Sequence, residues 1–340
     1  MLVVTVKLCC RLTVFAFSCV FASGIASLAS PFACAADAEQ RVARLGFVHS
    51  QSPSTTNRGL SAFWERLAEL GWVRGRNLTS EERWANGRID RLSGLMNEVI
   101  ARNIDVLVTY GTPAAIAAKK ATGTIPIVVA SMGDPVGAGV AASIAHPGGN
   151  LTGLSLELTE HIPEKWLELL QETVPGLATV AIIGNPDTPL LELVRHPLQV
   201  AAAARNLKLL YFEVRTPEAL EPTFKRAHKA AQAAVVIPDP MTFYYQRQVA
   251  VLAAKEHLPV MYGLAELVDA GGLMAYGPNQ ALFFRRAAEY VDKILRGAKP
   301  ADLPIEQPTQ FILSLNLKAA KSVGLTFPES IRLRADEVRE

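Results

Sequence analysis

In the first half of the chain, short apolar runs typical of strands alternate with segments whose apolar residues are spaced as in helices. Short runs rich in β-branched residues predict strands at 45–49, 78–84, 104–109 and 126–130. Between them, apolar residues recur every three or four positions, and the clearest series predicts a helix that ends before a glycine at position 71: Leu60, Phe63, Trp64, Leu67 and Leu70. Because strands and helices alternate, we expect a parallel sheet.

A second series of the same kind starts near residue 179. It predicts strands at 180–183, 207–214, 234–237 and 259–262, with room for a helix between each pair. The fold class that follows is α/β, with two Rossmann-like lobes built on parallel sheets.

The C-terminal part is less regular. A short strand is predicted at 273–276, Asn279 is expected to cap a helix that runs to about Leu295 before Gly297, and 311–316 is another extended run. We interpret 150–158, which resembles a strand but has no series of its own, as a crossing between lobes. With 276–280 and 307–311 as further crossings, an interpretation aided by the resemblance given below, lobe 1 takes in 43–153 plus 279–305 and lobe 2 takes in 156–275 plus 309–335.

The first thirty-odd residues predict an export signal. Lys7 and Arg11 precede an apolar run at 12–22, then small residues and the A-x-A stretch 33–35. We assign 1–36 to a signal peptide and expect a periplasmic protein. A membrane anchor is the less favoured alternative, because the apolar run is short for a bilayer span.

All four cysteines, Cys9, Cys10, Cys19 and Cys34, lie in this leader. The mature chain would therefore hold neither a disulfide nor a cysteine-ligated metal. Lipid attachment at Cys34 is the less favoured alternative to free release, since the residues before it are a poor match to such a site.

Composition limits the kinds of molecule that this protein is expected to bind. Half of the 340 residues are hydrophobic, enough for two ordinary domains. Of the 34 basic residues two lie in the leader, which leaves 32 against 32 acidic ones. This balance gives no sign of a nucleic-acid partner, and the six histidines show no metal-ligand spacing. We expect neither cofactor nor metal, and a monomer.

The stretch VLVTYGTPAAIAAKK, residues 106–120, places a helix start directly after a buried strand. Thr112 is predicted to be the N-cap and Pro113 the first helical residue. The N–H groups of this helix would then point outward from the edge of the sheet where the carboxyl ends of parallel strands meet and where ligands bind.

Similar polar loops with proline follow several predicted strands in both halves: Ser50–Pro53, Met132–Pro135, Asn185–Asp187 and Pro238–Pro240. If the two edges face one another, they enclose a polar crevice in which a ligand holds the lobes together. A helix cap or an ordinary turn is the alternative role at each position.

The chain also resembles a known family over about residues 43–340. The motifs that carry the resemblance are GFVHSQSPST (46–55), ELGWVRGRNL (69–78), ERWANGRIDRL (82–92), TYGTPAA (109–115), PIVVASMGDPVGAG (126–139), HPGGNLTGLS (146–155), GGLMAYGPN (271–279) and EQPTQFILSLNLKAAKSVGLTFP (306–328). They are similar to those of bacterial ABC-transporter substrate-binding proteins of the tryptophan/tyrosine type. The resemblance implies a type I periplasmic-binding-protein fold with three hinge crossings, and delivery of a small molecule to a membrane permease with its ATPase. An aromatic or other amino acid is the leading ligand.

Positions in that fold imply the ligand contacts. From the first lobe they are Ser50, Ser52, Thr112 and Asp134; from the second they are Asn185, Asp239, Tyr262 and Glu266, with Tyr276 at a hinge. Asp134 and Glu266 would pair with an ammonium group, while Thr112, the N–H groups of its helix and Ser52 would suit a carboxylate.

Two other functions stay open on sequence grounds. A periplasmic enzyme of the same architecture is disfavoured by the absence of the common hydrolase, zinc-protease and nucleotide signatures. His49 is the one histidine expected near the cleft, where a fully hydrogen-bonded or solvent-facing side chain is favoured over a catalytic one. A sensor module that reports to a receptor would have the same cleft as a transport protein.

Overall fold

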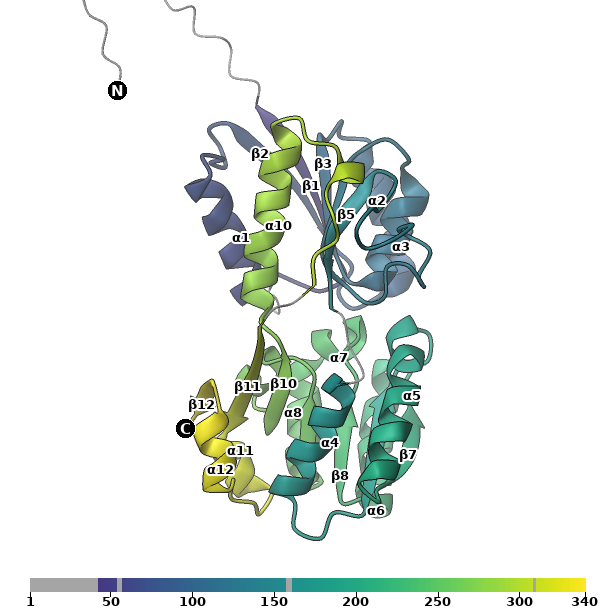
Figure 1. Cartoon of the computed structure of the whole chain (residues 1–340), viewed down its shortest axis with the longest axis vertical. Helices are drawn as coiled ribbons and strands as arrows, with labels where there is room; N and C mark the ends of the chain where they lie inside the picture. The colour runs from purple at the N-terminus through teal and green to yellow at the C-terminus, as the bar shows by residue number, and fades with distance from the viewer. Residues whose placement is uncertain (1–41, 54–56, 157–160, 308–309) are drawn as a thin grey trace, which may run out of the picture. The chain divides into compact units, whose positions relative to one another are not determined.

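The computed structural model describes residues 42–53, 57–156, 161–307 and 310–340, which belong to one compact unit. The predicted signal peptide and Cys34 lie outside the described residues. Within this unit the strands form two sheets, and each sheet with its helices is called a lobe below (Figure 1).

The first lobe contains a five-stranded parallel sheet in the order β2-β1-β3-β4-β5. Its strands are β1 (Ala43–His49), β2 (Leu78–Trp84), β3 (Val106–Tyr110), β4 (Ile127–Met132) and β5 (Leu151–Ser155). Its helices are α1 (Asn57–Glu69), α2 (Leu92–Ile100), α3 (Thr112–Ala121) and α10 (Gln280–Leu295), with short 3₁₀ turns at Ile89–Arg91 and Pro300–Asp302.

The second lobe contains a seven-stranded sheet in the order β12-β11-β10-β9-β8-β6-β7. Its strands are β6 (Thr179–Gly184), β7 (Lys208–Glu213), β8 (Ala233–Val236), β9 (Val260–Tyr262), β10 (Met274–Pro278), β11 (Phe311–Asn316) and β12 (Glu337–Arg339). Its helices are α4 (His161–Thr173), α5 (Pro189–Ala204), α6 (Leu220–Ala230), α7 (Pro240–Tyr244), α8 (Gln246–Lys255), α9 (Glu266–Asp269), α11 (Leu317–Ser322) and α12 (Glu329–Arg334), with a 3₁₀ turn at Pro217–Ala219.

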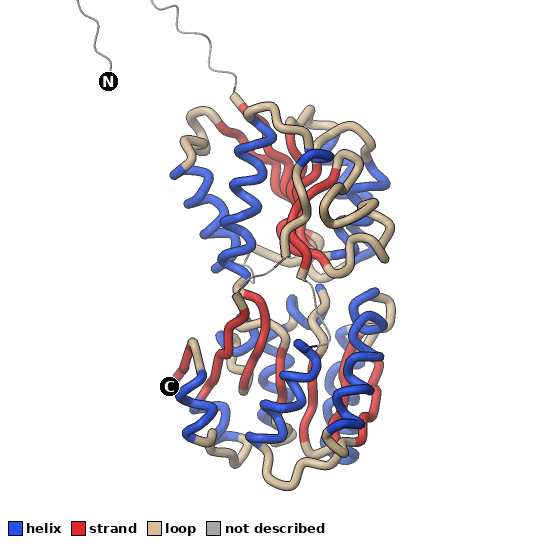
Figure 2. Tube along the Cα trace, in the orientation of Figure 1, coloured by secondary structure: helices blue, strands red, loops and turns tan. Residues whose placement is uncertain are grey.

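Helices cover both faces of each sheet (Figure 2). In the first lobe α1 and α10 pack on one face, and α2 and α3 pack on the other. In the second lobe α4, α5, α11 and α12 share one core, while α6 to α9 share the other. The central strands, such as β3, β4 and β8, are therefore apolar on both sides, which explains their continuous apolar runs in place of strict alternation.

The chain passes between the two lobes three times, as the sequence and the resemblance predict. It leaves the first sheet after β5, returns through β10 to α10, and leaves again after Glu306. Backbone hydrogen bonds join these passages, because Glu306 N–H donates to the Gly153 carbonyl at 3.0 Å and Asn279 N–H to the Gln310 carbonyl at 3.3 Å. The boundaries assigned to the lobes on sequence grounds stay a prediction.

Two details differ from expectation. Residues 151–155 do not serve only as a crossing, since they form β5 and pair with β4 at the edge of the first sheet. The second sheet is not wholly parallel, because β10 and β11 pair antiparallel. Strands β10 and β11 each adjoin a crossing. The chain leaves β10 for α10 in the first lobe and then returns as β11, which therefore runs in the opposite direction.

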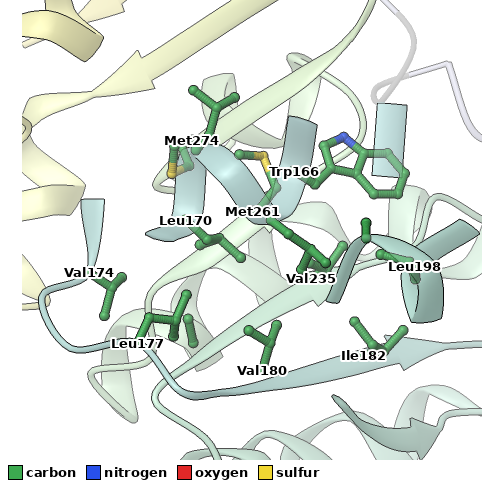
Figure 3. Packing of buried hydrophobic residues seen from close by; sticks show 14 of the residues in the cluster. Trp166, Leu170, Val174, Leu177, Val180, Ile182, Leu198, Val235, Met261 and Met274 are labelled. Atoms are coloured by element: carbon green, nitrogen blue, oxygen red, sulfur yellow. The ribbon is translucent and has the colours of Figure 1, made fainter. Parts of the chain in front are cut away.

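The packing of Trp166 fixes the beginning of the second lobe. This side chain is fully buried on α4, soon after the first crossing, among Leu170, Met261 and the other apolar residues seen in Figure 3. Its indole N–H donates to the carbonyl of Tyr276 in β10 at 2.7 Å. One side chain thus links the segments next to the first and second crossings.

Gly277 in β10 provides a test of how closely β10 approaches the backbone that follows β9. A Cβ built there would lie 1.9 Å from the Gly263 carbonyl oxygen, which is backbone and cannot move aside cheaply. We expect Gly277→Ala to lower the free energy of unfolding by at least about 2 kcal/mol. Gly123→Ala is the matched control, because no atom lies within 4 Å of its Cβ position. Urea unfolding that shows equal effects of the two substitutions would contradict the close approach.

Candidate ligand-binding site

A cavity is lined by residues of both lobes. It contains about 530 Å³ of space not filled by atoms, part of it open to solvent. Its first-lobe lining comes from the carboxyl ends of β3 and β4 and the residues that follow β1, β3, β4 and β5: Gln51, Tyr110–Pro113, Ser131–Gly133 and Leu156. Its second-lobe lining comes from the loops after β6, β8 and β9: Thr188–Leu190, Pro238–Pro240 and Leu264, with Phe243 from α7.

The strand ends line a common cavity as predicted, but the wall is mostly apolar and not the polar crevice that the loop composition predicted. The lining loops all follow the carboxyl end of a strand, which is the edge where ligands bind in parallel α/β sheets. Three helices, α3, α5 and α7, begin in the cavity wall. The first N–H groups of a helix have no acceptor within the helix, so a helix start gives such a wall hydrogen-bond donors.

The start of α3 lies one residue earlier than predicted. Gly111, not Thr112, is the N-cap, and Pro113 is the second helical residue. Gly111 has φ +90°, a conformation that a glycine adopts without strain. The Thr112 hydroxyl oxygen instead accepts the N–H of Gly133 at 2.8 Å and so joins the loops after β3 and β4. Its hydroxyl hydrogen can still be donated toward the cavity.

Three residues in the cavity wall carry buried oxygen atoms without a hydrogen-bond partner. They are Gln51 Oε1, Ser131 Oγ and Asp239 Oδ2. A buried polar atom without a partner costs free energy, and a set of them lining one cavity is typical of a ligand site.

Asp239 has the most defined environment of the three. Its Oδ1 accepts N–H groups of Met241 at 2.7 Å and Thr242 at 3.2 Å, which caps α7, while its Oδ2 has no partner. Burial raises the pKa of this carboxyl from 3.8 to about 6, and the backbone hydrogen bonds oppose part of that rise. A cationic group in the cavity would therefore pair with a carboxylate that the protein leaves half satisfied.

Two of the nine sequence-predicted residues, Thr112 and Asp239, line this cavity. Ser50 is buried next to it, and its hydroxyl donates to the Tyr110 carbonyl at 3.3 Å. Ser52 is buried in the same loop. Asn185 is buried beside a different groove, where its Oδ1 accepts the N–H of Asp187 at 2.9 Å.

Asp134 is exposed and does not line the cavity. Its Oδ1 accepts the N–H groups of Val136 at 3.0 Å and Gly137 at 2.8 Å, so the carboxylate caps its own turn. The ligand contact assigned to Asp134 on sequence grounds stays a prediction.

The remaining three predicted residues lie elsewhere. Tyr262 is fully buried in the core of the second lobe, and its hydroxyl has no partner. Tyr276 is half-buried and stacks on Phe311, with 6.0 Å between ring centroids. Glu266 lines a smaller second cavity, described below. For these residues too, ligand contact stays a prediction.

Sequence reasoning missed several residues of the wall. Gln51 lies between the predicted Ser50 and Ser52, and Thr188 directly follows the Asn185–Asp187 loop. Both were within reach of the same argument. Ser131 and Phe243 gave no signal, because a strand end and a short helix do not reveal which side chain turns toward the cavity.

The sequence favoured a fully hydrogen-bonded or solvent-facing His49, but the ring is buried and its Nε2 has no hydrogen-bond partner. His49 is fully buried at the end of β1, and its ring stacks with those of Trp84, Tyr110 and Phe284, at centroid distances of 5.1, 4.9 and 6.2 Å. Burial lowers its pKa from 6.5 to about 3, so the imidazole is neutral. Its Nδ1 accepts the Gln51 N–H at 3.1 Å, which holds the loop that carries Gln51.

Comparison with known families shows which family the chain belongs to. Residues 41–339 match the sequence model of the ABC transporter substrate-binding proteins. The chain belongs to this family. The recognition made from the sequence motifs is therefore confirmed, and so is the function of a substrate-binding protein for an ABC importer, as distinct from a family of enzymes.

Relatives of this substrate-binding protein share its fold. A "Tyrosine-binding protein" of Clostridioides difficile is 22% identical over 283 residues, which cover 83% of this chain and 80% of the relative. A conserved domain protein from Vibrio cholerae is 25% identical with a TM-score of 0.82, and the match covers 88% of this chain and 100% of that one. An ABC domain in complex with L-Trp from Streptococcus pneumoniae is 22% identical with a TM-score of 0.80, and the match covers 87% of this chain and 99% of that one.

The described part of the substrate-binding protein contains neither a cluster of metal-ligating side chains nor a helix suited to span a membrane. Among these residues, no three His, Cys, Asp or Glu side chains gather as a metal site would require. No helix within the same residues has the length and apolar character needed to cross a bilayer.

The second cavity lies against the first and shares Tyr110 and Phe243 with it. Its other lining residues are Gly59, Glu266, Gln280 and Phe284. The pKa of Glu266 is raised from 4.5 to about 7, mainly by burial; a backbone hydrogen bond and Arg58 oppose the rise, while Asp269 and Glu337 add to it. No ion pair joins Glu266 to a cation among the described residues, because Arg58 pairs with Asp269 at 3.1 Å and Glu337 at 3.1 Å.

This burial predicts how stability depends on pH. A carboxyl whose pKa is about 7 in the folded protein and 4.5 in the unfolded chain makes unfolding easier as pH rises from 4.5 to 7. We expect Glu266→Gln to remove this effect. The Tm of the variant minus that of the wild type should be a few degrees larger at pH 8 than at pH 5.

Thermal unfolding at the two pH values measures this change in the Tm difference. An effect of the substitution on packing lowers or raises the Tm equally at pH 5 and pH 8, so it does not contribute to the change. An equal difference at pH 5 and pH 8 would show that Glu266 is not desolvated in the folded protein.

Proposed function

We propose that this substrate-binding protein captures an amino acid with an aromatic side chain in the cavity between its lobes. The observation that carries the proposal is the pairing, within one cavity, of a half-satisfied carboxylate with a helix N-terminus. The named relatives support it, since one is a tyrosine-binding protein and another was solved with L-Trp.

The two charged ends of an amino acid fit opposite walls. The α-carboxylate suits the start of α3, where backbone N–H groups and the partial positive charge of the helix meet the Thr112 hydroxyl. The α-ammonium group suits Asp239, whose free Oδ2 accepts a charge-assisted hydrogen bond. We rank Asp239 above Asp134 as the ammonium partner, because Asp239 lines the cavity with a buried oxygen that has no partner, whereas Asp134 is exposed and lies outside the cavity lining.

The rest of the wall favours an apolar side chain. Met132, Leu156, Leu190, Phe243 and Leu264 contribute aliphatic and aromatic surface. Burying an aromatic ring against such a wall stabilises the complex by about 25 cal/mol for each Å² removed from water. Since both lobes supply the wall, the ligand gains most when the lobes are closed, and its differential affinity shifts the protein toward that state.

The cellular role follows from the family. We propose that the protein works in the periplasm after removal of residues 1–36, without catalysis, as a monomer, and that it delivers its ligand to an ABC permease with an ATPase at the inner membrane. The family assignment supports the delivery role over that of a sensor.

Asp239→Asn tests the proposed ammonium contact. The substitution keeps Oδ1, and with it the cap of α7, but removes the charge that pairs with the ligand. We expect the affinity for L-tyrosine or L-tryptophan, measured by titration calorimetry, to fall at least about tenfold, with little change in Tm. Asp134→Asn is the comparison and should change affinity less than about threefold.

Two results would contradict this assignment. One is an unchanged affinity of Asp239→Asn, which would move the ammonium site elsewhere. The other is the absence of any heat or thermal shift with these amino acids and the wild-type protein, which would remove aromatic amino acids as the ligand class.

A further inference from the structure

Two side-chain oxygens in the wall of the second cavity have no hydrogen-bond partner. Gln280 is 4% exposed, and its Nε2 donates to the Tyr110 hydroxyl at 2.9 Å. With the amide in this orientation, Gln280 Oε1 has no partner. Glu266 Oε2 is buried and also has no partner. The Tyr110 hydroxyl has one hydrogen to give and cannot satisfy both oxygens.

The other walls of this cavity are aromatic. The rings of Tyr110, Phe243 and Phe284 surround about 220 Å³ of space not filled by atoms, part of it open to solvent. Gly59 lets Phe284 come close, since a Cβ at position 59 would lie 2.4 Å from that ring. The cavity is thus a space between rings with unpaired acceptor oxygens in its wall.

Both lobes build the second cavity. Gly59, Tyr110, Gln280 and Phe284 belong to the first lobe, whereas Phe243 and Glu266 belong to the second. Tyr110 and Phe243 line the first cavity as well. A ligand whose charged end lies at α3 and Asp239 therefore meets, beyond these two shared residues, the acceptors of Glu266 and Gln280.

We propose that the second cavity is the distal subsite of the ligand site, and that Glu266 and Gln280 select a ligand whose aromatic side chain carries an O–H or N–H donor. The inference rests on the proposed function and deepens it, because it separates phenol and indole side chains from a plain phenyl ring. A phenyl ring would leave the buried acceptors unpaired, and a site built to receive a donor rejects the analogue that lacks it.

Calorimetry with L-tyrosine, L-tryptophan and L-phenylalanine tests the selection. We expect the wild-type protein to bind tyrosine and tryptophan at least about tenfold more tightly than phenylalanine. Glu266→Leu and Gln280→Met should each reduce this ratio to less than about threefold by weakening tyrosine and tryptophan while phenylalanine binding stays nearly constant.

Two further variants complete the experiment. Glu266→Gln keeps one acceptor oxygen and should retain more of the ratio than Glu266→Leu does. Glu65→Leu, at an exposed position of α1 outside both cavities, should leave the ratio at its wild-type value. Should Glu266→Leu fail to fold, Gln280→Met and Glu266→Gln decide the question.

The outcomes distinguish this inference from the proposal on which it rests. Wild-type protein that binds all three amino acids with affinities within threefold would overturn the donor selection but keep the proposed function, and would indicate that water satisfies the two oxygens. A ratio that survives both Glu266→Leu and Gln280→Met would also overturn it. Failure of all three amino acids to bind would overturn the proposed function itself.

Discussion

The two connected cavities contain more buried hydrogen-bond acceptors than the protein satisfies. Gln51, Asp239, Glu266 and Gln280 each have a side-chain oxygen without a partner, and all four line a wall built by both lobes. Such atoms make the closed arrangement costly without a ligand, because closure removes them from water. A ligand that brings donors reverses this cost, and the energy of closure is then coupled to recognition.

Rigid parts of the fold hold these groups in place. The stack of His49 with Trp84, Tyr110 and Phe284 joins the ends of β1, β2 and β3 to α10, the helix with which the chain returns to the first lobe. Tyr110 is a member of this stack and also lines both cavities. In the second lobe, the Trp166 indole links α4 to β10 at the crossings. The site is therefore supported by the same contacts that fix the connections between the lobes.

The sequence predicts those bounds of strands and helices that depend on neighbouring residues. Strands β2 and β11 and helix α10 have the predicted bounds, because alternating composition, the Asn279 cap and Gly297 act within a few residues. The sequence could not reveal that β5 pairs with β4 or that β10 and β11 run antiparallel, since these pairings depend on segments far apart in the chain. Likewise, adjacent residues in β9 face opposite cores, and the sequence did not show that Tyr262 turns away from the cavity. The sequence placed Asp239 correctly in the cavity wall, because a helix cap directly after a strand requires such a residue at the edge of the sheet.

A crystal structure of the protein with L-tyrosine is the most direct test of this account. It should show the amino acid between the lobes, with its carboxylate at the start of α3 and its ammonium group within hydrogen-bond distance of Asp239 Oδ2. Its phenol group should point toward Glu266 and Gln280. Tyrosine bound outside the two cavities, or bound between the lobes while these oxygens stay without donors, would contradict the claim that unpaired acceptors define the site.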